Sequence, residues 1–181
     1  MARLIHLNGP PGIGKSTLAE RYADEHVGVL NLDADRLRVL VGGWRERFAE
    51  TGALVRPIAM SMAATHLRAG HDVVMPQFLG RLSEIERFER VAHDSRAEFR
   101  EVVLMDTAER SAARFLRRGE QGRHRWVKEA VERDGGPALL AEMHDRLTAV
   151  LRARPDAVVV RSAEDEVEQT YRALLRVLTS S

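Results

Sequence analysis

The sequence predicts a single three-layer α/β domain built on a parallel sheet. Short runs rich in Val, Ile and Leu alternate with longer segments in which apolar residues recur every three or four positions. The short runs are almost continuously apolar, which is typical of strands covered on both faces, and the alternation of strand and helix implies right-handed crossovers. A chain of 181 residues, 44% of them hydrophobic, suits one core. We therefore expect one domain over residues 1–181.

The expected elements follow in chain order. Strands are predicted at residues 3–7, 27–32, 72–75, 101–105 and 157–161. Helical stripes are predicted at residues 55–66, 82–92, 139–151 and 167–178, the first of them after a break that contains Gly42, Gly43 and Gly52. Ligands of such sheets bind at the carboxyl ends of the strands, so the residues that follow each strand are the candidates for a site.

Composition narrows the possible chemistry. The chain has no cysteine, which excludes disulfides, cysteine nucleophiles and thiolate metal sites. The first residues, MARLIHLNG, contain an apolar run too short for a signal peptide, and no stretch approaches the roughly 20 apolar residues of a membrane span. We expect a cytoplasmic protein with no membrane partner. The net charge of +1 means that any basic function must be local.

The most specific motif lies between the first expected strand and a helix. Residues Gly9, Pro10, Pro11, Gly12, Ile13, Gly14, Lys15, Ser16 and Thr17 contain the pattern G-x-x-x-x-G-K-S/T. Its glycines allow backbone N–H groups to converge on an anion, and the helix N-terminus adds partial positive charge. We expect Lys15, one of two lysines in an arginine-rich chain, to reach the β- and γ-phosphates of ATP, and Ser16 to bind Mg²⁺.

Other nucleotide-binding classes fit less well. Neither of the two asparagines, Asn8 and Asn31, is followed by lysine, so the guanine-reading N-K-x-D is absent, and no D-x-x-G occurs. A guanine-nucleotide switch is therefore not expected. Motor and AAA-type ATPases usually need more chain than this for a helical lid and inter-subunit sensors.

Two carboxylates follow the second expected strand. Asp33 and Asp35 share a face if the strand continues, whereas Asp33 becomes the N-cap if a helix starts there. In the functional interpretation, one carboxylate accepts the proton of an attacking hydroxyl and the other orients a metal-bound water. In the structural interpretation, the pair is a solvated cap before an arginine-rich helix.

The sequence GPPGIGKST with a following D-x-D-x-x-R resembles the small P-loop kinases, especially polynucleotide 5′-kinases, zeta-toxin-type sugar-nucleotide kinases and chloramphenicol phosphotransferase. The resemblance implies a P-loop NTPase fold with a five-stranded parallel sheet in the order 2-3-1-4-5. It also implies Mg²⁺-dependent transfer of the γ-phosphoryl group of ATP to a hydroxyl, with Asp35 as the base and Arg38 as a substrate contact.

The sequence departs from these kinases after the third strand. Many of them carry an acidic residue there that holds a Mg²⁺-bound water, whereas this chain has Pro76 and Gln77. Either Asp33 or Asp106 substitutes for that residue, or the magnesium site is weak. Asp33 is thus a candidate for both substrate and metal binding. Gln77 is expected to contact substrate or merely to cap the turn.

A basic segment follows the fourth strand. Arg110, Arg114 and Arg117 or Arg118 share one helical face, and a glycine-flanked segment leads to Arg125 and Trp126. Its plain interpretation is a solvated helix or an RNA-contacting patch. The resemblance implies a LID over residues 117–128, with Arg114 and Arg118 stabilising the transferred group and Arg123 contacting nucleotide. It also implies adenine binding near residues 161–163, where Ser162 could instead be an N-cap.

Three functional hypotheses remain open, two of which differ in the phosphate acceptor. A small hydroxyl compound such as an antibiotic, nucleoside or sugar is favoured, because residues 38–62 could form an apolar substrate flap that includes Leu40, Val41, Trp44 and Phe48. Trp44 and Phe48 could equally be core residues. A polynucleotide 5′-hydroxyl is the second, since Arg36, Arg38, Arg45 and Arg47 could form a basic channel. A nucleotide-binding module without catalysis is the third.

Overall fold

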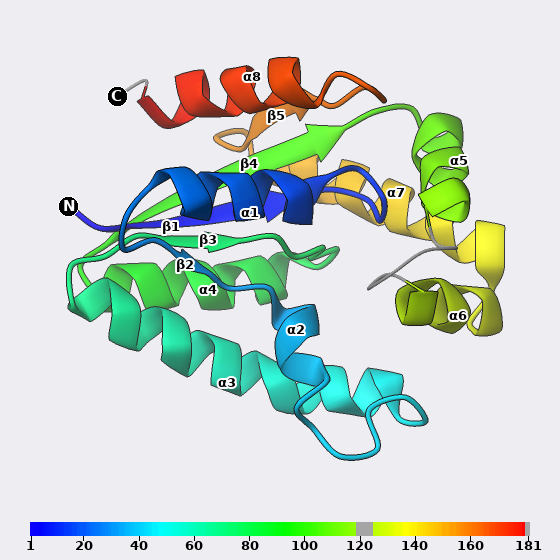
Figure 1. Cartoon of the computed structure of the whole chain (residues 1–181), viewed down its shortest axis with the longest axis horizontal. Helices are drawn as coiled ribbons and strands as arrows, with labels where there is room; N and C mark the ends of the chain where they lie inside the picture. Colours follow the sequence, from blue (N-terminus) through cyan, green and yellow to red (C-terminus); the bar gives the residue numbers. More distant parts are fainter. Residues whose placement is uncertain (119–124, 180–181) are drawn as a thin grey trace.

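A five-stranded, entirely parallel sheet forms the centre of the molecule (Figure 1). The computed structural model describes residues 1–118 and 125–179. The strands are β1 (Arg3–Asn8), β2 (Leu30–Asn31), β3 (Val73–Met75), β4 (Glu98–Met105) and β5 (Val158–Arg161). Their order in the sheet is β2-β3-β1-β4-β5. The predicted strand number, orientation and order are confirmed.

Helices cover both faces of this sheet. One face carries α1 (Lys15–Glu25) and α8 (Val167–Thr179), and the other carries α3 (Phe48–Arg68), α4 (Leu82–Asp94) and α7 (Gly136–Ala153). The alternation of side chains along β1 separates the two apolar layers, because Leu4 packs with α3 and α4 whereas Ile5 packs with α1 and α8. The result is the expected αβα sandwich.

Three further helices gather beyond the carboxyl ends of the strands (Figure 1). They are α2 (Ala34–Arg38), α5 (Ala108–Arg118) and α6 (Arg125–Arg133). A small separate apolar cluster, with Phe115, Val131 and Leu140 at its centre, joins α5, α6 and α7. Among the described residues, no helix is both long enough and apolar enough to span a membrane.

Two expected boundaries are wrong, each for a local reason. The strand expected at residues 27–32 is only Leu30–Asn31, because Gly28 takes a positive φ of 85° in a turn that leaves Val27 fully exposed. The first helical stripe begins at Phe48, so Gly52 lies inside α3 rather than in a break. A Cβ at Gly52 would lie 3.1 Å from the guanidinium of Arg38, which explains why glycine fits there.

The expected flap and LID divide among these elements. Residues 48–62 of the expected flap belong to α3, preceded by the turn over residues 39–47. Of the LID expected at residues 117–128, the structure describes the end of α5 and the start of α6, and residues 119–124 lie outside the described range.

Candidate active site

The glycine-rich loop wraps around the ammonium group of Lys15. Gly9, Gly12 and Gly14 have φ values of 146°, 79° and 107°, which side-chain-bearing residues rarely adopt. The Lys15 Nζ donates hydrogen bonds to the carbonyl oxygens of Gly9 at 2.7 Å and Pro10 at 2.9 Å. Burial lowers the pKa of Lys15 to about 8, against the opposing effect of the Asp35 and Asp33 carboxylates. The loop thus presents a largely enclosed lysine to the cavity in front of it.

Asp33 joins this loop to α2 and acts as a helix cap at the same time. Its Oδ1 accepts a hydrogen bond from the Asp35 backbone N–H at 3.0 Å, so Asp33 is the N-cap of α2. Its Oδ2 accepts a hydrogen bond from the Ser16 hydroxyl at 3.3 Å. The capping interpretation of Asp33 is confirmed, and the same side chain reaches the phosphate loop.

Asp35 lies in the first turn of α2 and lines the same cavity as Lys15. Burial raises the pKa of the Asp35 carboxyl, and the nearby Asp33 carboxylate adds to this shift. Arg38 and Lys15 oppose the shift because their positive charges stabilise the ionised form. Asp35 therefore lies at the cavity with a raised affinity for a proton.

Arg38 connects α2 to α3. Its guanidinium donates to the Phe48 carbonyl oxygen, lies 3.8 Å from the centre of the Phe48 ring and reaches Asp35 Oδ1 at 3.5 Å. Burial lowers the pKa of this guanidinium, and the contact with Asp35 acts in the opposite direction. Arg38 lines the cavity, as expected of a substrate contact, but it is already engaged by these neighbours.

Two polar side chains inside β1 hold the loop that carries Gln77. The His6 Nε2 is 2.9 Å from the Gln77 carbonyl oxygen, and burial lowers the pKa of His6 to about 4, so the ring is neutral and Nε2–H donates. Asn8 donates to the Leu79 carbonyl oxygen at 3.0 Å and accepts from the Leu79 N–H at 3.1 Å. Sequence reasoning missed both residues, although polar residues in a buried strand were a signal.

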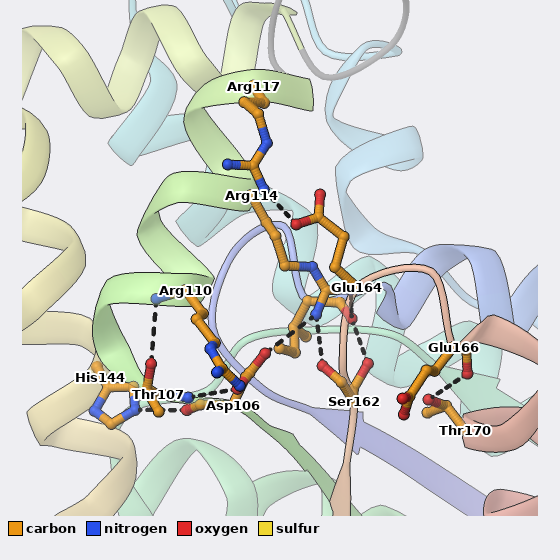
Figure 2. A network of polar contacts seen from close by, with 11 residues as sticks. Asp106, Thr107, Arg110, Arg114, Arg117, His144, Ser162, Glu164, Glu166 and Thr170 are labelled. Carbon is orange, nitrogen blue, oxygen red and sulfur yellow. Dashed lines mark hydrogen bonds and ion pairs between the residues drawn. The ribbon is translucent and has the colours of Figure 1, made fainter.

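Arg114 is a buried connector rather than an open arginine (Figure 2). Only 2% of it is exposed, and it donates to the Ser162 carbonyl oxygen at 2.5 Å and to the Ile13 carbonyl oxygen at 3.3 Å. Its Nη1 lies 3.8 Å from Asp106 Oδ2. Arg114 thus ties α5 to the phosphate loop and to the turn after β5. Asp106, which was a candidate for the carboxylate near the metal, faces Arg114 instead of Ser16.

Ser162 belongs to this network and does not cap α8. Its hydroxyl donates to the Ile13 carbonyl oxygen at 2.9 Å, and α8 begins only at Val167. The expected alternative of an N-cap at Ser162 is therefore wrong. A shallow hollow beside it is lined by Gly14, Thr17 and Arg114, which places the turn over residues 161–163 against the start of α1.

The remaining arginines of the expected LID differ in their surroundings. Arg110 is exposed and lies 3.8 Å from Asp106 Oδ1, and Arg117 is exposed and paired with Glu164 (Figure 2). Arg123 and the side chain of Arg118 lie outside the described residues.

A cavity of about 660 Å³ opens in front of the phosphate loop. Lys15, Ser16, Asp33, Asp35, Arg38 and Gln77 line one part, as expected of binding residues. Side chains of α5, α6 and α7 line another part. Phe48 and Trp126 also line the cavity, and the Trp126 ring lies 5.1 Å from the Trp44 ring and 5.5 Å from the Phe48 ring. Trp44 and Phe48 belong to none of the three core clusters, so the core interpretation of this pair is not supported.

The oxygen ligands that Mg²⁺ prefers are present beside the loop. The Ser16 hydroxyl and the Asp33 carboxylate are hydrogen-bonded to each other, and hard cations are held by one or two such protein oxygens together with phosphates and water. Within the described part of the chain, no group of three or more His, Cys, Asp or Glu side chains could hold a metal by itself. The residues present therefore fit a metal that arrives with a nucleotide.

Comparisons with known proteins agree with this architecture. Among the solved structures that match almost the whole chain is a gluconokinase from Sinorhizobium meliloti 1021, with a TM-score of 0.62 and 19% identity over 96% of this chain and 91% of that chain. The tunicamycin resistance protein of Deinococcus radiodurans matches with a TM-score of 0.64 and 16% identity over 100% of this chain and 98% of that chain. A putative kinase from Chloroflexus aurantiacus J-10-fl matches with a TM-score of 0.67 and 18% identity over 98% of this chain and 96% of that chain. At these identities the likeness shows the fold, which is that of the small P-loop kinases. No curated protein sequence matches.

A family model described as an AAA domain matches residues 4–148, which include the phosphate loop, the Asp33–Asp35 pair and most of the sheet. This P-loop chain belongs to the AAA-domain family whose model covers residues 4–148.

Proposed function

We propose that this protein transfers the γ-phosphoryl group of ATP to a hydroxyl group of a small molecule. The observation that carries the proposal is the hydrogen bond from Ser16 to Asp33, which fixes α2 beside the phosphate loop and leaves Asp35 lining the same cavity as Lys15. A kinase needs a phosphate-binding cation and a proton acceptor in one enclosed space, because water is the competing acceptor.

In the proposed reaction, Lys15 and the loop N–H groups bind the phosphates. The bond from the γ-phosphorus to its bridging oxygen breaks while the acceptor oxygen bonds to that phosphorus, and the hydroxyl proton passes to a carboxylate oxygen of Asp35. ADP and the phosphorylated acceptor leave. Mg²⁺ held through Ser16 and Asp33 would supply positive charge next to the phosphates. Arg114 would act through the position of α5, and Arg118 and Arg123 stay candidates for contact with the transferred group and the nucleotide.

The other two hypotheses, a polynucleotide kinase and a nucleotide-binding module without catalysis, have less support. Of the four expected arginines, Arg36 is paired with Glu20, Arg38 with Asp35, Arg47 lies 3.9 Å from Glu50, and Arg45 lies 4.9 Å from the centre of the Trp44 ring. A polynucleotide channel would need cations that are free of carboxylate neighbours, and three of these four are not. The hypothesis of a module without catalysis depended on the missing acid at residues 76 and 77. Asp33 weakens that argument because it offers a carboxylate directly beside Ser16.

Label transfer from ATP tests the proposal. The protein is incubated with γ-labelled ATP, Mg²⁺ and pooled small alcohols, nucleosides, sugars and 5′-hydroxyl oligonucleotides. We expect transfer to a small molecule, and Asp35→Asn should lower kcat by about 10²- to 10⁴-fold while nucleotide binding persists. Asp134→Asn is the matched control, since Asp134 also lines the cavity but lies beside Arg133 at its exposed side.

Three results would contradict parts of this proposal. Nucleotide binding with neither transfer nor hydrolysis would favour a binding module. Transfer only to oligonucleotides would favour the polynucleotide hypothesis. Full activity of Asp35→Asn together with an inactive Asp33→Asn would assign the base to Asp33.

A further inference from the structure

The part of the cavity that α5, α6, α7 and the loop after β3 line is mainly apolar. Phe78 of the loop after β3, Phe115 of α5, Val127 and Val131 of α6, and Leu139 and Met143 of α7 all face it. Phe115 and Val131 are buried members of the cluster that joins the three helices, so this wall has a packed support behind it. The apolar surface of a ligand bound here would be removed from water and would pack against these apolar side chains.

The charged groups of the lining do not favour an anionic acceptor. The cations among the described lining residues are Lys15, Arg36 and Arg38. Lys15 faces the phosphate site, Arg36 is paired with Glu20, and Arg38 is engaged by Asp35 and the Phe48 carbonyl oxygen. The lining also contains four carboxylates, those of Glu20, Asp33, Asp35 and Asp134. Three cations against four carboxylates give the described lining a formal charge of −1, so a carboxylate or phosphate on the acceptor would gain no net attraction there.

Two buried polar atoms of lining residues, the Gln77 side-chain oxygen and Arg38 Nε, have no hydrogen-bond partner within the described chain, and the first of them is an acceptor. Leaving a buried amide oxygen unpaired is costly, so a hydroxyl or N–H group of a bound ligand would relieve it. His6 and Asn8 fix the loop that carries Gln77, so this amide is positioned before a ligand arrives.

We propose that the acceptor is an uncharged compound with an apolar body, which packs against α5, α6 and α7 while one of its polar groups bonds to Gln77 and a hydroxyl faces Asp35. This inference rests on the proposed function for the role of that hydroxyl. The binding preference itself depends only on the cavity lining. It distinguishes the acceptor from sugar acids and from nucleotides, which carry negative charge.

Calorimetry with a homologous series tests the preference. Methyl, hexyl and octyl β-glucoside are titrated into the full chain below their micelle concentrations, with gluconate as the anionic comparison. We expect one-to-one binding whose affinity rises about fourfold for each added methylene that reaches the apolar wall. Gluconate should bind more weakly than methyl β-glucoside, the uncharged compound of the series that lacks the long alkyl chain.

Two variants on one helix locate the effect. Met143→Lys places a cation at the apolar wall, and we expect it to weaken octyl glucoside binding at least tenfold. Ala141→Lys is the control, because Ala141 is exposed on the same helix and does not line the cavity, and it should stay within twofold of the wild-type protein. Gln77→Leu should weaken all three glucosides by a similar factor.

The results separate this inference from the proposed function. Affinity that is independent of chain length, gluconate binding as tight as methyl glucoside, or equal effects of the two lysine variants would overturn the inference. Length-dependent binding without any phosphate transfer would leave the inference standing and refute the proposed function. Transfer to gluconate in preference to the glucosides would support the proposed function and refute the inference.

Discussion

Replacing Arg114 with methionine tests whether this arginine is a connector or a catalytic group. Methionine keeps much of the side-chain volume but removes the donors to the Ser162 and Ile13 carbonyl oxygens and the positive charge beside Asp106. Hydrogen bonds from a charged group contribute about 1.5–3 kcal/mol each, and removing one partner of a buried charge pair costs about 3–5 kcal/mol. We expect the free energy of unfolding to fall by about 3–5 kcal/mol.

Urea denaturation followed by circular dichroism measures this loss. Arg110→Met is the matched control, because Arg110 faces the same Asp106 from the same helix but is 62% exposed in its side chain, so its loss should cost less than about 1 kcal/mol. Unchanged stability of Arg114→Met together with a 10³-fold loss of kcat would refute the connector role and favour direct contact with the transferred group. Equal losses of stability in the two variants would refute the argument from burial.

Two further predictions concern the phosphate loop and the strand beneath it. Gly12→Ala should lose about 2–4 kcal/mol of stability and bind ATP more weakly, because the φ of Gly12 is 79° and the new Cβ would lie 2.8 Å from the Phe115 Cα. Gly43→Ala is the control, because Gly43 has a φ of 72° but open space around it, so in urea denaturation it should lose only about 1 kcal/mol. Equal losses in the two variants would contradict the steric argument. The pKa of His6 is about 4 when folded, so between pH 4 and 6.5 the unfolded chain binds a proton that the folded chain does not, and the free energy of unfolding should rise with pH by up to about 1.4 kcal/mol per unit. Urea titrations of His6→Gln should lack that increment, and identical pH profiles would show that His6 is not responsible.

Much of the fold could be predicted because it depends on local periodicity. Continuous apolar runs such as Val73–Met75 predict buried parallel strands, and stripes with helical spacing predict α4, α7 and α8 close to their observed bounds. The phosphate loop could be predicted as well, since its function resides in backbone geometry that glycine spacing encodes directly. The strand order came from the family resemblance rather than from any residue pattern.

Other features depend on contacts between residues far apart in the chain. Asp33 was expected either to cap a helix or to serve the site; one of its oxygens caps α2 and the other accepts a hydrogen bond from Ser16. Gly52 was expected in a break before a helix, but it lies inside α3, where a Cβ would lie 3.1 Å from the Arg38 guanidinium. Nothing in the spacing of Arg114 distinguishes it from Arg110 or Arg117, whereas its burial against Ile13 and Ser162 does.

By itself, the sequence determined that this protein has a phosphate-binding loop between a buried strand and a helix, with two carboxylates nearby. Only the tertiary structure decided which carboxylate meets Ser16, which arginine is enclosed and how apolar the far wall of the cavity is. The physical reason is that loop conformation and element type follow from neighbouring residues, whereas burial and charge pairing depend on side chains that the fold brings together from separate elements.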